Sequence, residues 1–269
     1  LDETIEVIEK YKSDNISFTY LLARLFVEKK KYDEAFDLYK EIDKKQNTKG
    51  AELFNFGEFV YRDGEYSIAS EVFKFLIVNY SDQENIPLAK LAYAKTQEAL
   101  FTQKYKRDNP EWKTFFITLT AEANEIDPVI KAYQEIIKVY QNSEVAVEAN
   151  LRIGMLLFHY RNDINEAEKY FKIITESYPT SKFASLSFVE LGNISIQQAK
   201  LDEAEKYFQS VAKLPRANIE DKGFANYQLA RIFSFKNDFE SARKNLLTVM
   251  GNLKDNIAND AIAFSILLN

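Results

Sequence analysis

Residues 151–171, which read LRIGMLLFHYRNDINEAEKYF, decide the fold. A large apolar residue stands directly before a small one at Ile153 and Gly154. A second small residue follows at Ala167, and an aromatic residue comes four positions later at Phe171. Two helices approach closely only where small side chains face each other, and a ring one helical turn further on fills the space beside them. The stretch therefore predicts two helices packed against each other.

The same arrangement recurs along the chain. The second small residue returns at Ala35, Ala69, Ala167, Ala204 and Ala242, with a degenerate copy at Val129. Ala35 and Ala69 are 34 residues apart, and the later copies follow each other at 37 or 38. The first small residue stands twelve or thirteen positions before the second, at Ala23, Gly57, Gly154, Gly192 and Ala230. Each helix pair leaves an apolar face that only the next pair can cover, so the pairs must stack.

This pattern resembles the tetratricopeptide repeat (TPR) over nearly the whole chain. The resemblance implies an all-α fold, a right-handed α-solenoid of antiparallel helix pairs known as the TPR superhelix. We expect residues 1–269 to be a single solenoid segment of about six repeats, with both ends cut from a longer array. A non-repetitive helical bundle is the alternative fold.

One connection adds a second resemblance. The link Tyr178-Pro179-Thr180-Ser181-Lys182-Phe183-Ala184, with weaker versions near Tyr140 and Tyr80, is similar to links in bacterial envelope TPR proteins. Such proteins include the lipoprotein of the outer-membrane barrel-assembly machinery and periplasmic cell-division coordinators. This resemblance favours the bacterial periplasm or an association with the outer membrane, and the cytoplasm is the alternative.

The spacing breaks once, because Ala69 and Val129 are 60 residues apart. We expect a first helix from Pro87 to about Lys104, with Ala94 as its small residue. An irregular insert near 105–126, which contains the only tryptophan, Trp112, then lengthens both helices or forms an arm.

The chain closes with a segment, Asp260 to Leu268, that reads as one more first helix. Its apolar residues predict weak self-association by end-to-end stacking; they are Ile262, Phe264, Ile266, Leu267 and Leu268.

Composition limits the classes of function. The net charge is −6, whereas binding to phosphates needs a basic face, so we expect no nucleic-acid partner. No apolar run reaches the roughly 18 residues of a transmembrane helix. The chain has no cysteine and a single histidine, His159, which leaves no typical zinc site. There is no phosphate-binding glycine loop. We therefore expect no enzyme, no catalytic residue, no metal and no cofactor.

In a TPR stack the first helices line the concave face, so the resemblance implies a groove. Its lining should come six and three residues before the first small residue, and one, four and five after it. The expected groove residues are Tyr20, Arg24, Phe54, Glu58, Tyr61, Arg62, Phe158, Asn193, Phe224, Tyr227 and Arg231. The same positions also hold Glu28, Leu151, Met155, His159, Val189, Gln197 and Phe235.

This lining is rich in Tyr, Phe and Arg, the side chains that dominate interface energetics. It lacks the Lys and Asn with which some TPR proteins clamp a carboxyl terminus. The resemblance implies a scaffold that binds a partner protein or peptide in its concave groove, in a bacterial envelope complex. Two alternatives remain open: a regulatory or binding region of a larger multidomain enzyme or sensor, and an enzyme or carbohydrate-binding solenoid.

Overall fold

The computed structural model describes residues 2–11, 15–110, 120–251 and 257–268, and within these ranges the regular elements are helices. In chain order, the described helices begin with α1 (Asp2–Tyr11), α2 (Ile16–Glu28), α3 (Tyr32–Gln46), α4 (Ala51–Arg62), α5 (Tyr66–Asn79), α6 (Ile86–Asp108), α8 (Ala123–Val139) and α9 (Glu144–Leu156). A π-helix, η1 (Leu157–Arg161), follows directly. The remaining helices are α10 (Ile164–Ser177), α11 (Ala184–Gln197), α12 (Leu201–Lys213), α13 (Ile219–Phe235), α14 (Phe239–Met250) and α15 (Ala258–Leu267). The predicted all-α fold class is confirmed.

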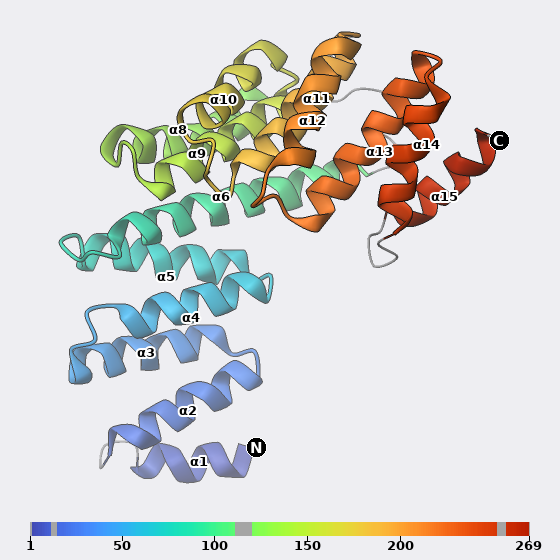
Figure 1. Cartoon of the computed structure of the whole chain (residues 1–269). Helices are drawn as coiled ribbons and strands as arrows, with labels where there is room; N and C mark the ends of the chain where they lie inside the picture. The colour runs from blue at the N-terminus through green and yellow to red at the C-terminus, as the bar shows by residue number, and fades with distance from the viewer. Residues whose placement is uncertain (1, 12–14, 111–119, 252–256, 269) are drawn as a thin grey trace. The chain divides into compact units, whose positions relative to one another are not determined.

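The chain divides into two compact units, Leu1–Gln141 and Asn142–Asn269, which we call unit 1 and unit 2. In each unit, helices that follow one another in the chain pack side by side, and Figure 1 shows α1 to α5 of unit 1 stacked in chain order. The predicted pairs α2–α3, α4–α5, α11–α12 and α13–α14 are all present. The first member of each pair is called a first helix below. A single solenoid through residues 1–269 stays a prediction, because each unit is described by itself.

The contact between small and aromatic residues is present as predicted. A Cβ atom added at Gly192 would lie 2.5 Å from Cζ of Phe208, and one added at Gly154 would lie 2.7 Å from Cε1 of Phe171. Both rings are fully buried. Each glycine therefore gives its first helix the space to approach the aromatic ring of the second helix.

Where the second helix of a pair follows the first helix after a short turn, a residue with left-handed backbone conformation ends the first helix. These residues are Lys30, Gly64, Asn162, Ala199 and Asn237, with φ between 55° and 86°. The backbone N–H of the next residue then donates to a carbonyl five residues earlier, as from Lys31 to Phe26 and from Lys200 to Ser195. This is a Schellman-type end, which satisfies helix carbonyls and reverses the chain.

The π-helix η1 explains why one pair of small residues is thirteen positions apart and the others twelve. The closing hydrogen bond after η1 runs from Asp163 N–H to the carbonyl of Leu157, six residues rather than five. A π-helical turn holds one more residue than an α-helical turn. The extra residue between Gly154 and Ala167 is therefore absorbed inside η1, and the pair α9–α10 keeps its packing.

Tyrosines in the links join consecutive repeats. Asp43 is 2% exposed and accepts hydrogen bonds from the backbone N–H of Gly50 (2.7 Å) and from the hydroxyls of Thr48 and Tyr80. In unit 2, the hydroxyl of Tyr178 donates to Asn142 Oδ1 over 2.9 Å. Each tyrosine thus fixes its own link to the link one repeat earlier.

The link that resembles envelope proteins also starts the next first helix. The hydroxyl oxygen of Ser181 accepts from Phe183 N–H, and the Ser181 carbonyl accepts from Ala184 N–H. These bonds satisfy backbone donors at the beginning of α11, which would otherwise lack partners.

The irregular region is partly described. A helix predicted from Pro87 to about Lys104 is present as α6, and its small residue Ala94 is 1% exposed. Of the insert near 105–126, residues 111–119 with Trp112 lie outside the described residues. The predicted last first helix is α15, where Ile266 and Leu267 are 69% and 81% exposed, while Phe264 and Leu268 pack against the buried cluster that contains Leu246 and Ala261. Self-association through this surface stays a prediction.

Candidate interaction groove

The eleven predicted groove residues share one property: each keeps part of its side chain accessible. Arg24, Arg62 and Arg231 are exposed, and the others are intermediate: Tyr20, Phe54, Glu58, Tyr61, Phe158, Asn193, Phe224 and Tyr227. Leu151, which holds an equivalent position, is 4% exposed and belongs to the core. Its expected place in the groove stays a prediction, because Val189, at another equivalent position, is 5% exposed and still lines a hollow.

Several of these residues also stabilise the repeats. Phe54 packs its ring against that of Phe73 at 5.7 Å between centroids, and Tyr227 packs against Phe264 at 6.2 Å. Burial raises the pKa of the Tyr20 hydroxyl above its ordinary value, and the Glu52 and Asp43 carboxylates act in the same direction. Such rings are held rigidly by the core, so their exposed edges can bind a partner with little loss of conformational entropy.

In unit 1, the predicted residue Tyr61 lines a hollow of about 350 Å³ between α4 and α6. The opposite wall is formed by α6, with Lys95, Glu98, Ala99 and Lys106. Lys95, Glu98 and Ala99 stand one, four and five residues after Ala94, so the rule used for the other repeats would have identified them. They were missed because the broken spacing made Ala94 an uncertain reference point.

In unit 2, three successive first helices border a larger hollow of about 560 Å³. We call it the acidic groove; it is lined by Leu186, Val189, Glu190, Asn193, Glu220, Asp221, Phe224, Ile257 and Asp260. Val189, Asn193 and Phe224 are predicted groove positions. Glu220 and Asp221 were missed because the rule does not reach the extra first turn of α13, and Glu190 stands at a position that the rule does not include.

Glu190 joins this groove to η1. Its Oε2 accepts a hydrogen bond from Asn193 Nδ2 over 3.3 Å, and its Oε1 lies 3.6 Å from Nε2 of His159. The ring of Phe158 lies 4.8 Å from that of His159, centroid to centroid. The structure therefore brings His159 of η1 and Asn193 of α11, both at predicted groove positions, to the same carboxylate.

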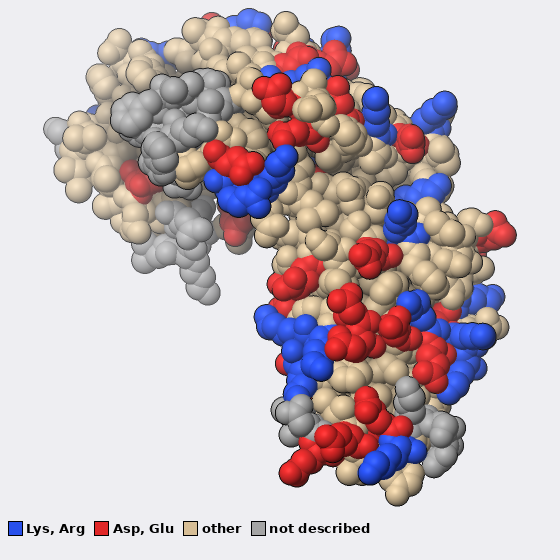
Figure 2. All heavy atoms as spheres, turned by 180° about the vertical axis from the view of Figure 1, so that it is seen from behind, with Lys and Arg blue, Asp and Glu red and all other residues tan. Residues whose placement is uncertain are grey.

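The predicted arginines are held by local partners. Arg62 forms an ion pair with Glu58 over 3.8 Å, and Arg231 donates to Gln228 Oε1 over 2.9 Å. Over the face of unit 1 in the lower part of Figure 2, acidic and basic side chains are interspersed. This mixture of charges agrees with the expectation of a protein partner rather than nucleic acid, which binds to a continuous basic surface.

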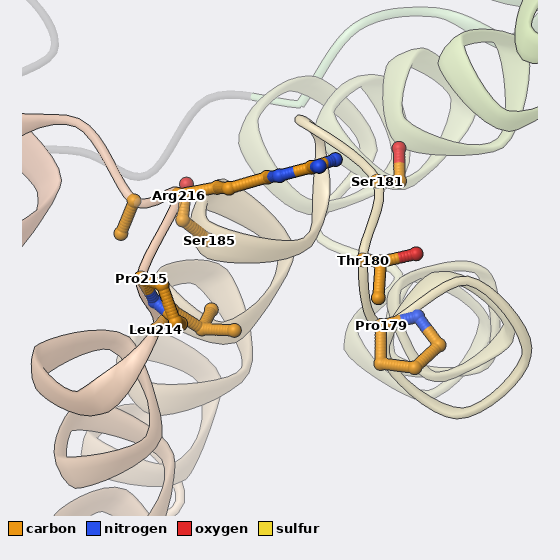
Figure 3. Close-up of a pocket in the computed structure, with 8 residues that line it drawn as sticks. Pro179, Thr180, Ser181, Ser185, Leu214, Pro215 and Arg216 are labelled. Carbon is orange, nitrogen blue, oxygen red and sulfur yellow. The ribbon is translucent and has the colours of Figure 1, made fainter.

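A further hollow, of about 360 Å³, lies between the two links of unit 2 that precede α11 and α13. Figure 3 shows Pro179, Thr180 and Ser181 on one side, and Leu214 and Pro215 on the other, with Arg216 across the top. The turns rather than the helix faces form its walls, so it lies apart from the predicted groove positions.

Within the described ranges, no three His, Cys, Asp or Glu side chains converge as metal ligands, and no helix there has the length and apolar character needed to cross a lipid bilayer.

Two segments match family models for the tetratricopeptide repeat, residues 148–181 and residues 187–218. They cover α9 with α10, and α11 with α12. The chain contains tetratricopeptide repeats. Repeats of this kind form protein-interaction scaffolds, and the fold is typically non-catalytic. None of the curated protein sequences compared with the chain matches it.

Solved structures show the same fold at low sequence identity. PilF of Pseudomonas aeruginosa superposes with a TM-score of 0.58 at 14% identity, covering 83% of this chain and 91% of PilF. The C-terminal part of a TPR repeat-containing protein from Cytophaga hutchinsonii gives 0.57 at 13% identity, covering 97% and 94%. PilW, a type IV pilus biogenesis factor, gives 0.55 at 14% identity, covering 91% and 97%. The predicted TPR solenoid fold is thereby confirmed.

Proposed function

We propose that the first helices of this scaffold form a groove that binds a segment of a partner protein, and that the complex belongs to the bacterial envelope. The observation that carries the proposal is the acidic groove, a hollow lined by three successive first helices, with Val189, Asn193 and Phe224 at positions expected to contact a partner. Both an extended segment and a helix can bind in a groove of this kind.

The side chains in the groove suit this role. Phe224 offers an accessible aromatic surface, and its ring is fixed by packing against the buried ring of Phe208 at 6.2 Å between centroids. Asn193 adds a polar group beside it. An aromatic anchor with a few polar neighbours is the usual composition of a protein-binding hot spot.

The envelope setting is supported by two observations. One is the link of residues 178–184, which resembles those of envelope TPR proteins. The other is the similarity of fold to PilW, whose structure is described as that of a type IV pilus biogenesis factor. We infer that this chain likewise serves an envelope assembly.

The proposal is tested by photo-crosslinking in the source organism. A benzoylphenylalanine at position 193 in place of Asn193 should capture a partner, and the same residue in place of Lys206, exposed on the second helix α12, serves as the matched control. We expect a crosslinked product at position 193 that is lost with Phe224→Ala, and none at 206. Crosslinking at 206 alone would refute a groove on the first helices. Identification of the captured protein by mass spectrometry tests the setting, because a cytosolic partner would contradict the envelope.

A further inference from the structure

The acidic groove has a one-sided charge. Among the described residues, nine line the groove: four are carboxylates, those of Glu190, Glu220, Asp221 and Asp260, and none is lysine or arginine. The hollow in unit 1 differs, because Lys95 and Lys106 line it together with Glu98. The acidic character therefore belongs to this groove and is not shared by the hollow on the first helices of unit 1.

One of the four carboxylates, that of Glu190, is mostly buried and has one hydrogen bond and one longer contact within the described residues. The side chain of Glu190 is 7% exposed, yet its Oε2 receives only the long bond from Asn193, and its Oε1 is 3.6 Å from His159 Nε2, beyond hydrogen-bond distance. A buried carboxylate gains strongly from a cationic hydrogen-bond donor. Because Glu190 lines the hollow, a ligand in the groove can supply that donor.

The other carboxylates lie on α13 and at the start of α15. Asp221 accepts a hydrogen bond from the Ser185 hydroxyl over 2.5 Å, which fixes its position beside α11. Glu220 and Asp260 are exposed. The apolar side chains of Leu186, Val189 and Phe224 lie among these charges. The groove thus combines negative charge with apolar contacts.

We propose that the acidic groove binds a basic segment of the partner protein, in which lysine or arginine side chains alternate with apolar ones. This inference rests on the proposed function and specifies the chemistry of the partner. The cationic groups pair with Glu190, Glu220 and Asp260, and the apolar residues contact Phe224 and Leu186. Complementary charge accelerates the encounter and fixes the orientation of the bound segment.

The test uses the full chain and three short fluorescein-labelled peptides in fluorescence anisotropy. The first contains Lys, Leu and Ala, and in the other two every Lys is replaced by Gln or by Glu. We expect the Lys peptide to bind roughly tenfold more tightly than the Gln peptide, from a few partly exposed ion pairs. We expect its affinity to fall as NaCl is added, since salt screens exposed charges.

A matched pair of variants locates the binding. Glu220→Gln/Asp260→Asn removes two exposed carboxylates in the first turns of α13 and α15. The control, Glu240→Gln/Asp33→Asn, removes two exposed carboxylates in the first turns of α14 and α3, outside the groove. Both change the net charge equally. The groove variant should bind the Lys peptide roughly fivefold more weakly than the native chain, and the control variant should bind it with unchanged affinity.

Each other outcome overturns the inference. Equal loss in the two variants would mean that the peptide responds to overall charge. Equal affinity for the Lys and Gln peptides, with both weakened by Phe224→Ala, would leave a groove that binds protein without charge selection, and the proposed function would stand. Tighter binding of the Glu peptide, or binding of none, would refute a basic partner. The crosslinking at position 193 then decides separately whether the groove binds a protein.

Discussion

Replacing Gly192 by alanine tests the contact on which each repeat depends. The added Cβ would lie 2.5 Å from Cζ and 2.6 Å from Cε1 of Phe208, whereas carbon atoms in proteins pack at about 3.5–4.0 Å. The ring is fully buried, so a shift of about 1 Å must displace the side chains packed around it. Overpacking of this kind costs about 1–3 kcal/mol, and alanine returns about 1 kcal/mol through its higher helix propensity. We expect Gly192→Ala to destabilise the protein by up to about 2 kcal/mol.

The chain itself offers the compensating change. One repeat later the same two positions hold Ala230 and Leu246, both fully buried in one cluster. Leucine is shorter than phenylalanine, so it leaves room for the alanine methyl group. In the variant Gly192→Ala/Phe208→Leu the two substitutions should therefore cost about 1–2 kcal/mol less than the sum of the single variants, a typical coupling for residues in contact.

The assay is urea unfolding followed by circular dichroism, with the midpoint and the slope compared among the native chain, the two single variants and the double variant. Gly251→Ala is the control, because a Cβ there meets no other atom within 3.4 Å and φ is −63°. It should leave the midpoint almost unchanged. If Gly192→Ala is as stable as the native chain, or if the double variant shows no coupling, the close approach of α11 and α12 does not depend on this glycine.

Four other predictions follow from the local structure. Ala199→Gly should raise the free energy of unfolding by up to about 1 kcal/mol, because alanine has φ 59° there; an unchanged urea midpoint would contradict this. Burial and the hydrogen bond to Asp43 raise the pKa of Tyr80 to about 12 from 10.0, so the contribution of Tyr80 to stability is constant below pH 10 and falls between pH 10 and 12, where the unfolded chain loses this proton first. Tyr80→Phe should reduce this loss of stability when unfolding is measured at several pH values between 10 and 12. An equal loss in the native chain and the variant would refute the role given to Tyr80. Deletion of His159 should convert η1 to α-helix and keep α10 protected in hydrogen exchange, whereas loss of that protection would show that the extra residue is required. Sedimentation should show weak self-association that Leu267→Lys removes, and a native chain that is monomeric at every concentration would argue against it.

The sequence was sufficient to predict the helix pairs, because their spacing reflects steric contact. A glycine and a phenylalanine that must touch, such as Gly154 and Phe171, leave a pattern that survives changes in the rest of the repeat. The positions facing the groove follow from the same reference points. For this reason Val189, Asn193 and Phe224 could be placed before the structure was known, and the structure finds them on one hollow.

The chemistry of the groove could not be predicted in the same way. Glu220 and Asp221 stand in the first turn of α13, where carboxylates complement the helix dipole whatever lies beside them. Glu190 is two residues before Gly192, a position that counting alone does not assign to the groove. Only the packing of α11 against its neighbours shows that its carboxylate is buried and lines a hollow.

The π-helix is a place where side-chain positions cannot be predicted by counting residues along an α-helix. Each residue turns an α-helix by about 100°, so one inserted residue would move every later side chain to another face. The extra residue in η1 is absorbed before Asn162, and α10 therefore keeps its place against α9. The positions of side chains inside η1 therefore cannot be predicted from the residue spacing of an α-helix. His159, the one histidine of the chain, stands inside η1, and its Nε2 lies 3.6 Å from Oε1 of Glu190, a residue that lines the acidic groove.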